Sequence, residues 1–286
     1  MRHAVLGAGG IGGLIAAALA RSGAEVAVLL RPDSLAAYSG QLRVESVVLG
    51  DFEVNVPASS SLESAVDVLW VTTKATQLDE AVALAPPDCV GEGFVVPLLN
   101  GVDHLEKLRR RYPRVVAAAI RVESERAGPG LIRQKTPFLR VDMAGAESVQ
   151  TALREAGIEC EARSDGVTLL WEKLVMLAPI ALATTAYDAA LGDVREKTEF
   201  VGCRSEAASA AAAAGAQVES DAISRLHEAM PAELRSSMQK DVTAGREPEL
   251  DAIAGPIIRL GQEHQFPTKA TKSLVDRITA RLTKAG

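Results

Sequence analysis

The sequence predicts an α/β domain with a doubly wound parallel sheet in residues 1–165, followed by an all-helical domain in residues 166–286. Short β-branched runs alternate with helical stretches up to about Asp165, which is typical of a parallel sheet covered by helices. Beyond Asp165 the strand pattern ends and long apolar-periodic segments follow. A chain of 286 residues also exceeds the usual size of one domain, so two domains are expected.

Five apolar runs are the expected strands of the sheet: residues 4–6, 25–30, 68–72, 94–98 and 115–119. Residues 42–56 alternate around a Leu49-Gly50-Asp51 turn, which predicts a hairpin that extends the sheet, and residues 130–141 are expected to add edge pairing. The expected helices of the second domain are residues 168–191, 199–214, 221–228, 249–264 and 268–283. Gly192, Gly215 and Pro267 stand where these helices should end.

Charge and composition favour a small-molecule partner. The net charge is -6 and no run of five like charges occurs, so the chain lacks the electrostatic footprint of a protein that binds nucleic acid or anionic lipid. Residues 169–190 form the most apolar stretch, but charged residues and a proline interrupt it. This stretch is expected to be a buried helix, and no segment is expected to span a membrane.

The cysteines and histidines indicate neither a disulfide framework nor a metal site. The three cysteines are odd in number and lack a CxxC spacing, and the four histidines show no HxxxH or clustered pattern. The N-terminus opens directly into a strand rather than a signal peptide. We therefore expect a reducing, cytoplasmic location and no bound metal.

A glycine-rich turn joins the first expected strand to a helical run. It consists of Gly7, Ala8, Gly9, Gly10, Ile11 and Gly12, a GxGxxG motif. In a Rossmann fold the first glycine permits the tight turn, the second lets backbone amides approach a pyrophosphate, and the third lets the helix pack closely on the strand. The helix N-terminus then faces the anion with free N–H groups. The motif predicts a bound dinucleotide; the alternative is a purely structural glycine turn.

The end of the second expected strand indicates which dinucleotide is bound. Sites selective for NAD usually end this strand with an acid that hydrogen-bonds the ribose 2'-hydroxyl, whereas here it ends in Leu30-Arg31. An arginine offers a planar fork to a 2'-phosphate. Asp33 is close to the end of this strand but lies beyond Pro32. An N-cap of the next helix is an equally good interpretation of this acid. NADP(H) is therefore the predicted cofactor.

Several separated motifs resemble the ketopantoate reductase family, in the same order and at similar spacing over nearly the whole chain. They are the glycine turn with Arg31, Val71-Thr72-Thr73-Lys74-Ala75, Asn100-Gly101, Trp171-Glu172-Lys173-Leu174, Ser236-Ser237-Met238 with Asp241, and Glu249-Leu250-Asp251. The resemblance implies an NADPH-dependent oxidoreductase of pantothenate biosynthesis. Such an enzyme reduces a 2-oxo acid, ketopantoate or a more apolar relative, to the 2-hydroxy acid by hydride transfer.

The resemblance also implies the roles of individual residues. Lys173 would donate a proton to the carbonyl oxygen, and Glu249 would orient that lysine or the substrate hydroxyl. Ser237 would hold the substrate carboxylate, while Lys74 and Asn100 would lie beside the nicotinamide and the substrate. Lys74, Asn100 and Glu249 are thus also expected to contact the cofactor. The alternatives are ordinary ones, namely surface lysines, a helix cap at the asparagine, an acid at a helix start and a solvent-facing serine.

The chain departs from the family pattern beside the expected proton donor. The family places asparagines four and eight residues after its lysine, on one helix face, where this chain has Leu177 and Ala181. Leu99 also replaces the usual glutamine before Asn100. Two other functions therefore stay open, a β-hydroxyacid or opine-type dehydrogenase and a non-catalytic NADP(H)-sensing protein. The expected partner is a small carbonyl compound, and a homodimer is left open.

Overall fold

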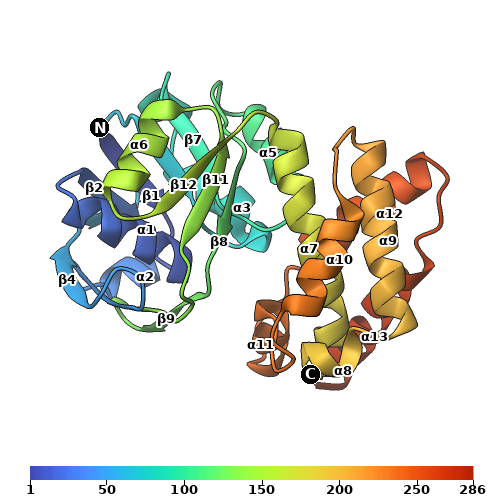
Figure 1. Cartoon of the computed structure of the whole chain (residues 1–286). Coiled ribbons are helices and arrows are strands. Elements are labelled where there is room, and N and C mark those ends of the chain that lie inside the picture. Colours follow the sequence, from blue (N-terminus) through green and yellow to red (C-terminus); the bar gives the residue numbers. More distant parts are fainter. Residues whose placement is uncertain (286) are drawn as a thin grey trace. The chain divides into compact units, whose positions relative to one another are not determined.

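The computed structural model describes residues 1–285, which form two compact units (Figure 1). Unit 1 comprises Met1–Leu99 and His104–Leu169, and unit 2 comprises Asn100–Asp103 and the chain that follows Leu169. The expected domain boundary after Asp165 would leave Asn100–Asp103 in the first domain. Strands occur in unit 1, whereas the regular elements of unit 2 are helices, so the predicted fold class is confirmed.

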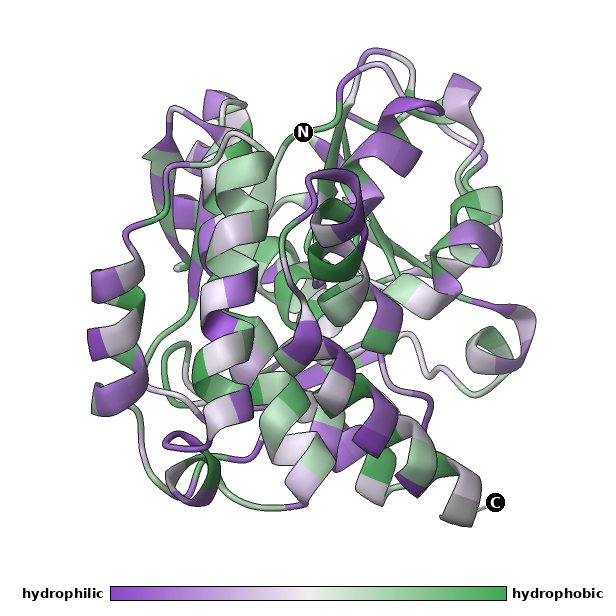
Figure 2. Cartoon of the chain, turned by 90° about the vertical axis from the view of Figure 1, so that its right-hand side faces the viewer, coloured by the Kyte–Doolittle hydropathy of each residue, from purple (hydrophilic) through white to green (hydrophobic). Residues whose placement is uncertain are grey.

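The main sheet of unit 1 has five parallel strands in the order β5-β2-β1-β6-β7. Their bounds are Arg2–Leu6 for β1, Glu25–Leu29 for β2, Ala58–Ser59 for β5, Val68–Val71 for β6 and Phe94–Pro97 for β7. Because both faces of a parallel sheet are covered, its central strands are largely apolar, and every residue of β6 is buried. Figure 2 shows these strands mostly in the green of apolar residues, while many exposed loops and helix ends are purple.

Two smaller sheets complete unit 1. One has the order β4-β3-β10-β9, with β3 at Gln41–Ser46, β4 at Phe52–Asn55, β9 at Ser124–Gly128 and β10 at Leu131–Gln134. The other has the order β12-β11-β8, with β8 at Ala118–Arg121, β11 at Arg140–Ala144 and β12 at Glu159–Arg163. The hairpin predicted at residues 42–56 therefore forms, as β3 and β4, but it does not extend the main sheet. Its free edge pairs with β10 instead, which makes that part of the prediction wrong.

The strand predicted at residues 115–119 is displaced along the chain. Val115 makes a single parallel bridge to Val95, and the continuous strand β8 begins only at Ala118, where it pairs antiparallel with β11. The apolar run is therefore shared between two sheets. Its first part contacts the edge of the main sheet and its second part belongs to the three-stranded sheet.

Helix α1, Gly10–Arg21, lies between the main sheet and the four-stranded sheet, since it packs on β1 and β2 and also on β3, β4, β9 and β10. Its residues Leu14 to Leu19 are completely buried, which explains why small and branched apolar side chains fill this helix. The other helices of unit 1 are α2 Pro32–Ala36, η1 Ala75–Gln77, α3 Leu78–Ala81, η2 Val82–Leu84, α4 Pro87–Val90, α5 His104–Arg109 and α6 Glu147–Glu155.

A buried histidine couples the stability of the main sheet to pH. His3 on β1 is 2% exposed and its Nδ1 accepts a hydrogen bond from Trp70 Nε1 at 3.2 Å. Burial, aided by the positive N-terminus and opposed by Asp67, lowers the pKa of His3 to about 4. The folded state holds the imidazole ring of His3 in its neutral form. The contribution of His3 to stability is therefore fully present above pH 6.5, its ordinary pKa, and is lost as the pH falls from there toward 4.

We expect the His3 contribution to reduce the free energy of unfolding by about 2 kcal/mol between pH 7.5 and pH 5. The variant His3→Asn keeps an acceptor for Trp70 but cannot titrate in this range. Urea denaturation of both proteins at the two pH values measures the difference. If the variant loses the same amount of stability between the two pH values, protonation of His3 is not the cause of the loss.

Unit 2 consists of seven helices within the described residues. They are α7 Gly166–Tyr187, α8 Leu191–Val194, α9 Thr198–Ala213, α10 Ser220–Ala229, α11 Ser237–Thr243, α12 Leu250–Glu263 and α13 Lys269–Ala285. Helices α9, α12 and α13 pack on one another, and their inward faces bury residues such as Phe200, Ile257 and Leu274. The five predicted helices correspond to α7, α9, α10, α12 and α13, whereas α8 and α11 are additional.

By length and composition alone, α7 could cross a membrane, although the sequence predicts no membrane-spanning segment. Its apolar window is 67% buried inside the structure, with Leu174, Val175, Ala178 and Leu182 in the core of unit 2. Most residues of this stretch are thus buried, which agrees with the buried helix predicted for it.

Candidate functional site

The glycine turn of unit 1 has the geometry that a close approach requires. Gly7, directly after β1, has φ +94°, a conformation that strongly favours glycine, and its N–H donates to Leu29 O at 3.0 Å. A Cβ on Gly12 would overlap Gly7 O and Thr72 Oγ1, so only glycine permits this contact between α1 and the turn. A Cβ on Gly10 would likewise overlap the backbone at Ser124.

Gly9 differs from these glycines because the space beside it is open. It is the N-cap of α1 in an extended conformation, and a Cβ placed on it would meet no protein atom within 4 Å. The first N–H groups of a helix have no partner within the helix. The N-terminus of α1 therefore combines an open approach over Gly9 with donors suited to an anion.

Two further predicted residues follow strands that neighbour β1 on either side. Arg31 lies two residues beyond the end of β2, is exposed, and is the N-cap of α2. Asp33 is in the first turn of α2 rather than at its cap, which corrects that expectation. Lys74 follows β6 and is the N-cap of η1. Since carboxyl ends of parallel strands meet at one sheet edge, these residues share that edge with the glycine turn.

Thr72 and Thr73 connect β6 to Lys74 and pack against the turn. Thr72 Oγ1 donates to the carbonyl oxygens of Leu6 and Gly7, at 2.9 and 2.8 Å as alternative acceptors. Thr73 Oγ1 is buried and makes no hydrogen bond, and its methyl group lies on the Cβ side of Gly7. Thr73 stands in a motif without a predicted role, because the sequence does not reveal that its hydroxyl lacks a hydrogen-bond partner.

In unit 2, one face of α7 carries the predicted proton donor. Lys173, Leu177 and Ala181 are spaced four residues apart and so lie on the same face. Lys173 is 9% exposed, although lysine is rarely buried unless its ammonium group has partners. This burial favours a specific role over the alternative of an exposed lysine in the first helical turns.

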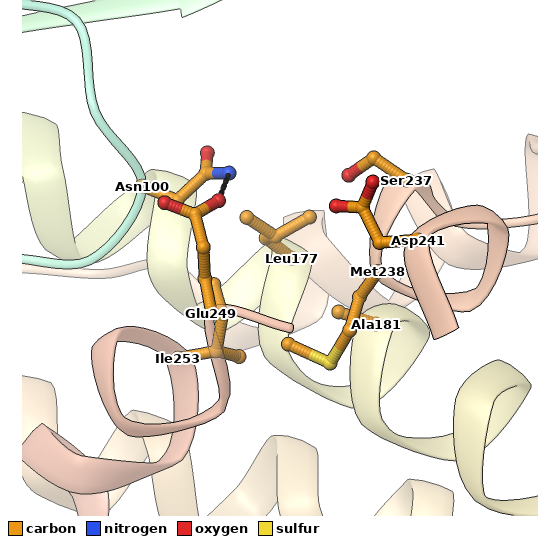
Figure 3. A pocket seen from close by; sticks show the side chains of 8 residues that line it. All are labelled: Asn100, Leu177, Ala181, Ser237, Met238, Asp241, Glu249 and Ile253. Atoms are coloured by element: carbon orange, nitrogen blue, oxygen red, sulfur yellow. Dashed lines mark hydrogen bonds between the residues drawn. The ribbon is translucent and has the colours of Figure 1, made fainter. Parts of the chain in front are cut away.

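A pocket in unit 2 brings together three of the predicted residues (Figure 3). It is lined by Asn100, Leu177, Ala181, Ser237, Met238, Asp241, Glu249 and Ile253. Asn100 Nδ2 donates to Glu249 Oε2 at 3.1 Å across a separation of 149 residues. Gly101, with φ +83°, lets the chain approach Ala252 on α12 closely enough for that bond.

The opposite wall of the pocket comes from α11. Ser236 caps this helix by accepting from Gln239 N at 3.1 Å, and its hydroxyl also hydrogen-bonds Thr184 of α7 at 2.8 Å. This link holds the exposed Ser237 at the pocket. Asp241, one turn later on α11, pairs with Arg246 at 2.7 Å, so a cation balances the charge of one of the two pocket carboxylates.

The structure thus separates the predicted residues into two groups, each within its own unit. Gly7, Gly9, Gly12, Arg31 and Lys74 lie at the strand ends of unit 1. Asn100, Ser237 and Glu249 line the pocket of unit 2, whereas Lys173, in the same unit, is not among the residues that line it.

The apolar pocket residues Met238 and Ile253 were not predicted as part of a site. Met238 was named only within a motif, and neither side chain shows a local signal that distinguishes it from core. Among residues 1–285, no three histidine, cysteine or acidic side chains cluster in a way that could hold a metal ion.

Two family models match the chain. The model described as "Ketopantoate reductase PanE/ApbA" matches residues 3–148, and the model described as "Ketopantoate reductase PanE/ApbA C terminal" matches residues 167–281. A 2-dehydropantoate 2-reductase from Archaeoglobus fulgidus is 30% identical over 97% of this chain and 96% of its own length.

Solved structures are similar over almost the whole chain. A PanE/ApbA family ketopantoate reductase from Ralstonia eutropha has a TM-score of 0.90 and 26% identity, covering 99% of both chains. A D-mandelate dehydrogenase solved with NADH and anilino(oxo)acetate has a TM-score of 0.89 and 20% identity over 99% of both chains. At that identity, the second likeness concerns the fold alone.

Proposed function

Because the chain belongs to the ketopantoate reductase family and is therefore an oxidoreductase, we propose that it reduces a 2-oxo acid to the 2-hydroxy acid with NADPH. Ketopantoate or a more apolar 2-oxo acid is the substrate. The observation that carries the proposal is the unit 2 pocket, which Asn100 lines together with Ser237 and Glu249 although it lies 149 residues from Glu249 in sequence.

The turn of unit 1 fits the phosphates of a dinucleotide. The close contacts at Gly7 and Gly12 hold the backbone tightly, and the open side of Gly9 leaves room for an anion at the helix N-terminus. Arg31 would bind the 2'-phosphate, and the buried Thr73 hydroxyl at the same edge has no protein partner. Lys74, Asn100 and Glu249 would contact the nicotinamide end. When bound, NADPH supplies the hydride that reduces the carbonyl carbon.

The residues of unit 2 then orient the substrate and manage the proton. Ser237 would donate a hydrogen bond to the substrate carboxylate, and the Asn100 amide, held by Glu249, would position the carbonyl. Lys173 would transfer a proton to the carbonyl oxygen as hydride reaches the carbon, so that the ketone becomes a secondary alcohol. A cationic ammonium group suits this step because negative charge develops on that oxygen in the transition state.

Steady-state turnover tests the proposal, with NADPH oxidation followed in the presence of a panel of 2-oxo acids. The panel contains ketopantoate, aliphatic 2-oxo acids and phenylglyoxylate. We expect reduction of at least one, with the 2-hydroxy acid as the product. Binding of NADPH without turnover of any member would favour a cofactor-sensing protein, and reductive coupling to amines would favour an opine-type dehydrogenase.

We further propose that the protein acts in the cytoplasm as a homodimer. All three cysteines are free thiols, which supports a reducing compartment. Light scattering of the purified chain at several concentrations would measure its oligomeric state, and a constant monomer mass would contradict the dimer.

Replacing Arg31 with alanine should raise the Michaelis constant for NADPH by about 10- to 100-fold, the loss of a charge-assisted hydrogen bond worth roughly 1.5–3 kcal/mol. The constant for NADH, which lacks the 2'-phosphate, should stay close to that of the unchanged protein. Arg43→Ala, which alters an exposed arginine on β3, is the control. Equal effects on both cofactors would contradict the role of Arg31.

A further inference from the structure

The face of α7 in the unit 2 pocket presents only hydrocarbon to an occupant. Leu177 and Ala181 supply this face, and both line the pocket. Met238 of α11 and Ile253 of α12 continue the apolar surface, being 4% and 2% exposed. Figure 3 shows Leu177 between the Asn100–Glu249 pair and the side chains of Ser237 and Asp241, with Ala181 and Met238 lying together below them.

The polar groups lie on the other walls, and both carboxylates among them already have partners. The Asn100 amide donates to Glu249, and the Asp241 carboxylate accepts from Arg246. A 2-oxo acid needs polar contacts for its carboxylate and its ketone, which the residues proposed above would provide. The rest of the molecule must then meet the apolar surface of Leu177, Ala181, Met238 and Ile253.

A hydroxyl group on that part of the substrate would be buried without a partner. Water would be removed from it on binding. Leu177, Ala181 and Ile253 can neither donate nor accept a hydrogen bond in exchange, and the thioether of Met238 is only a weak acceptor. A branched hydrocarbon group would instead bury apolar area against the same side chains. Met238 suits such contacts because its unbranched, polarizable side chain adapts to irregular shapes.

We propose, on the basis of the function proposed above, that the substrate is a 2-oxo acid with a branched aliphatic side chain and no distal hydroxyl group. Leu177 and Ala181 are the residues that set this specificity. Ketopantoate, which carries a terminal hydroxyl, is a poorer substrate than its analogue without one.

A matched pair of substrates tests this specificity. Ketopantoate is 4-hydroxy-3,3-dimethyl-2-oxobutanoate, and trimethylpyruvate is the same molecule without the hydroxyl oxygen. We expect the unchanged protein to reduce trimethylpyruvate with a kcat/KM about 10- to 100-fold higher, which is the range in which an apolar pocket rejects an added hydroxyl. If NADPH reduces neither acid nor any other in the panel, the proposed function fails. If ketopantoate is reduced as well or better, only the substrate inference is overturned.

Two variants test the residues themselves. Leu177→Asn restores a hydrogen-bonding side chain on the α7 face and should shift the kcat/KM ratio toward ketopantoate by about tenfold. Ala181→Ser adds a hydroxyl with little volume, so it should shift the ratio in the same direction without overpacking the buried site. Val167→Asn, which changes an exposed residue of the same helix, is the control and should leave the ratio unchanged. An unchanged ratio in both pocket variants would overturn the assignment.

Discussion

Replacing Lys173 with methionine should lower kcat by about 10²- to 10⁴-fold, the usual contribution of a positioned proton donor. Methionine has a similar length and remains apolar, so it should fill the buried position without leaving a large cavity. The loss should appear in kcat with every 2-oxo acid that the protein reduces. Affinity for NADPH, measured by titration of cofactor fluorescence, should be unchanged because the predicted phosphate-binding residues lie in unit 1.

An exposed lysine provides the control for this experiment. Lys269, the first residue of α13, is exposed, so Lys269→Met should preserve both kcat and thermal stability. Thermal unfolding of the Lys173 variant separates a chemical effect from a structural one. Retention of full turnover in a folded Lys173→Met protein would refute its role as the proton donor.

Local patterns were sufficient to predict four of the five strands of the main sheet and the five longest helices of unit 2. The strands β1, β2, β6 and β7 were predicted because parallel strands buried on both faces appear as continuous apolar runs. The partner of each strand in the smaller sheets was not predictable, since the alternation of residues 42–56 indicates a hairpin but not the edge it will join. Helix α11 was missed because seven residues give little periodicity, although Ser236 is a typical cap.

The parts of the candidate site that are local in sequence were predictable, whereas the contacts between distant residues were not. The glycine turn was predictable because its strand, turn and helix are consecutive in sequence. The Asn100–Glu249 contact joins residues 149 positions apart, so only the resemblance to a family placed them in one site. Met238 and Ile253 could not be distinguished from core residues, because the sequence does not show which apolar side chains border a pocket.

The open space at Gly9 and the close contacts at Gly12 predict opposite consequences for the same small substitution. Gly12→Ala forces a methyl group onto Gly7 O and Thr72 Oγ1, so backbone must shift. Overpacking of this kind costs about 1–3 kcal/mol, and the melting temperature should fall by roughly 2–12 °C. Gly9 has φ -76° and ψ -167°, which alanine adopts readily, and it has no neighbour on that side, so Gly9→Ala should melt at the temperature of the unchanged protein.

Gly9→Ala should weaken the binding of NADPH although it leaves the stability of the protein unchanged. If the pyrophosphate lies over Gly9, the new methyl group occupies the space that it needs, and the dissociation constant should rise at least about tenfold, or 1.4 kcal/mol. Calorimetric titration with NADPH, beside thermal unfolding of the same samples, measures both properties. The control is Ser22→Ala, which changes the C-cap of α1, away from the turn. Gly23→Ala is unsuitable as a control because Gly23 has a positive φ. If the stable Gly9→Ala protein binds NADPH with unchanged affinity, the phosphates do not bind at this turn. If Gly12→Ala melts at an unaltered temperature, the close packing of the turn against β6 is contradicted.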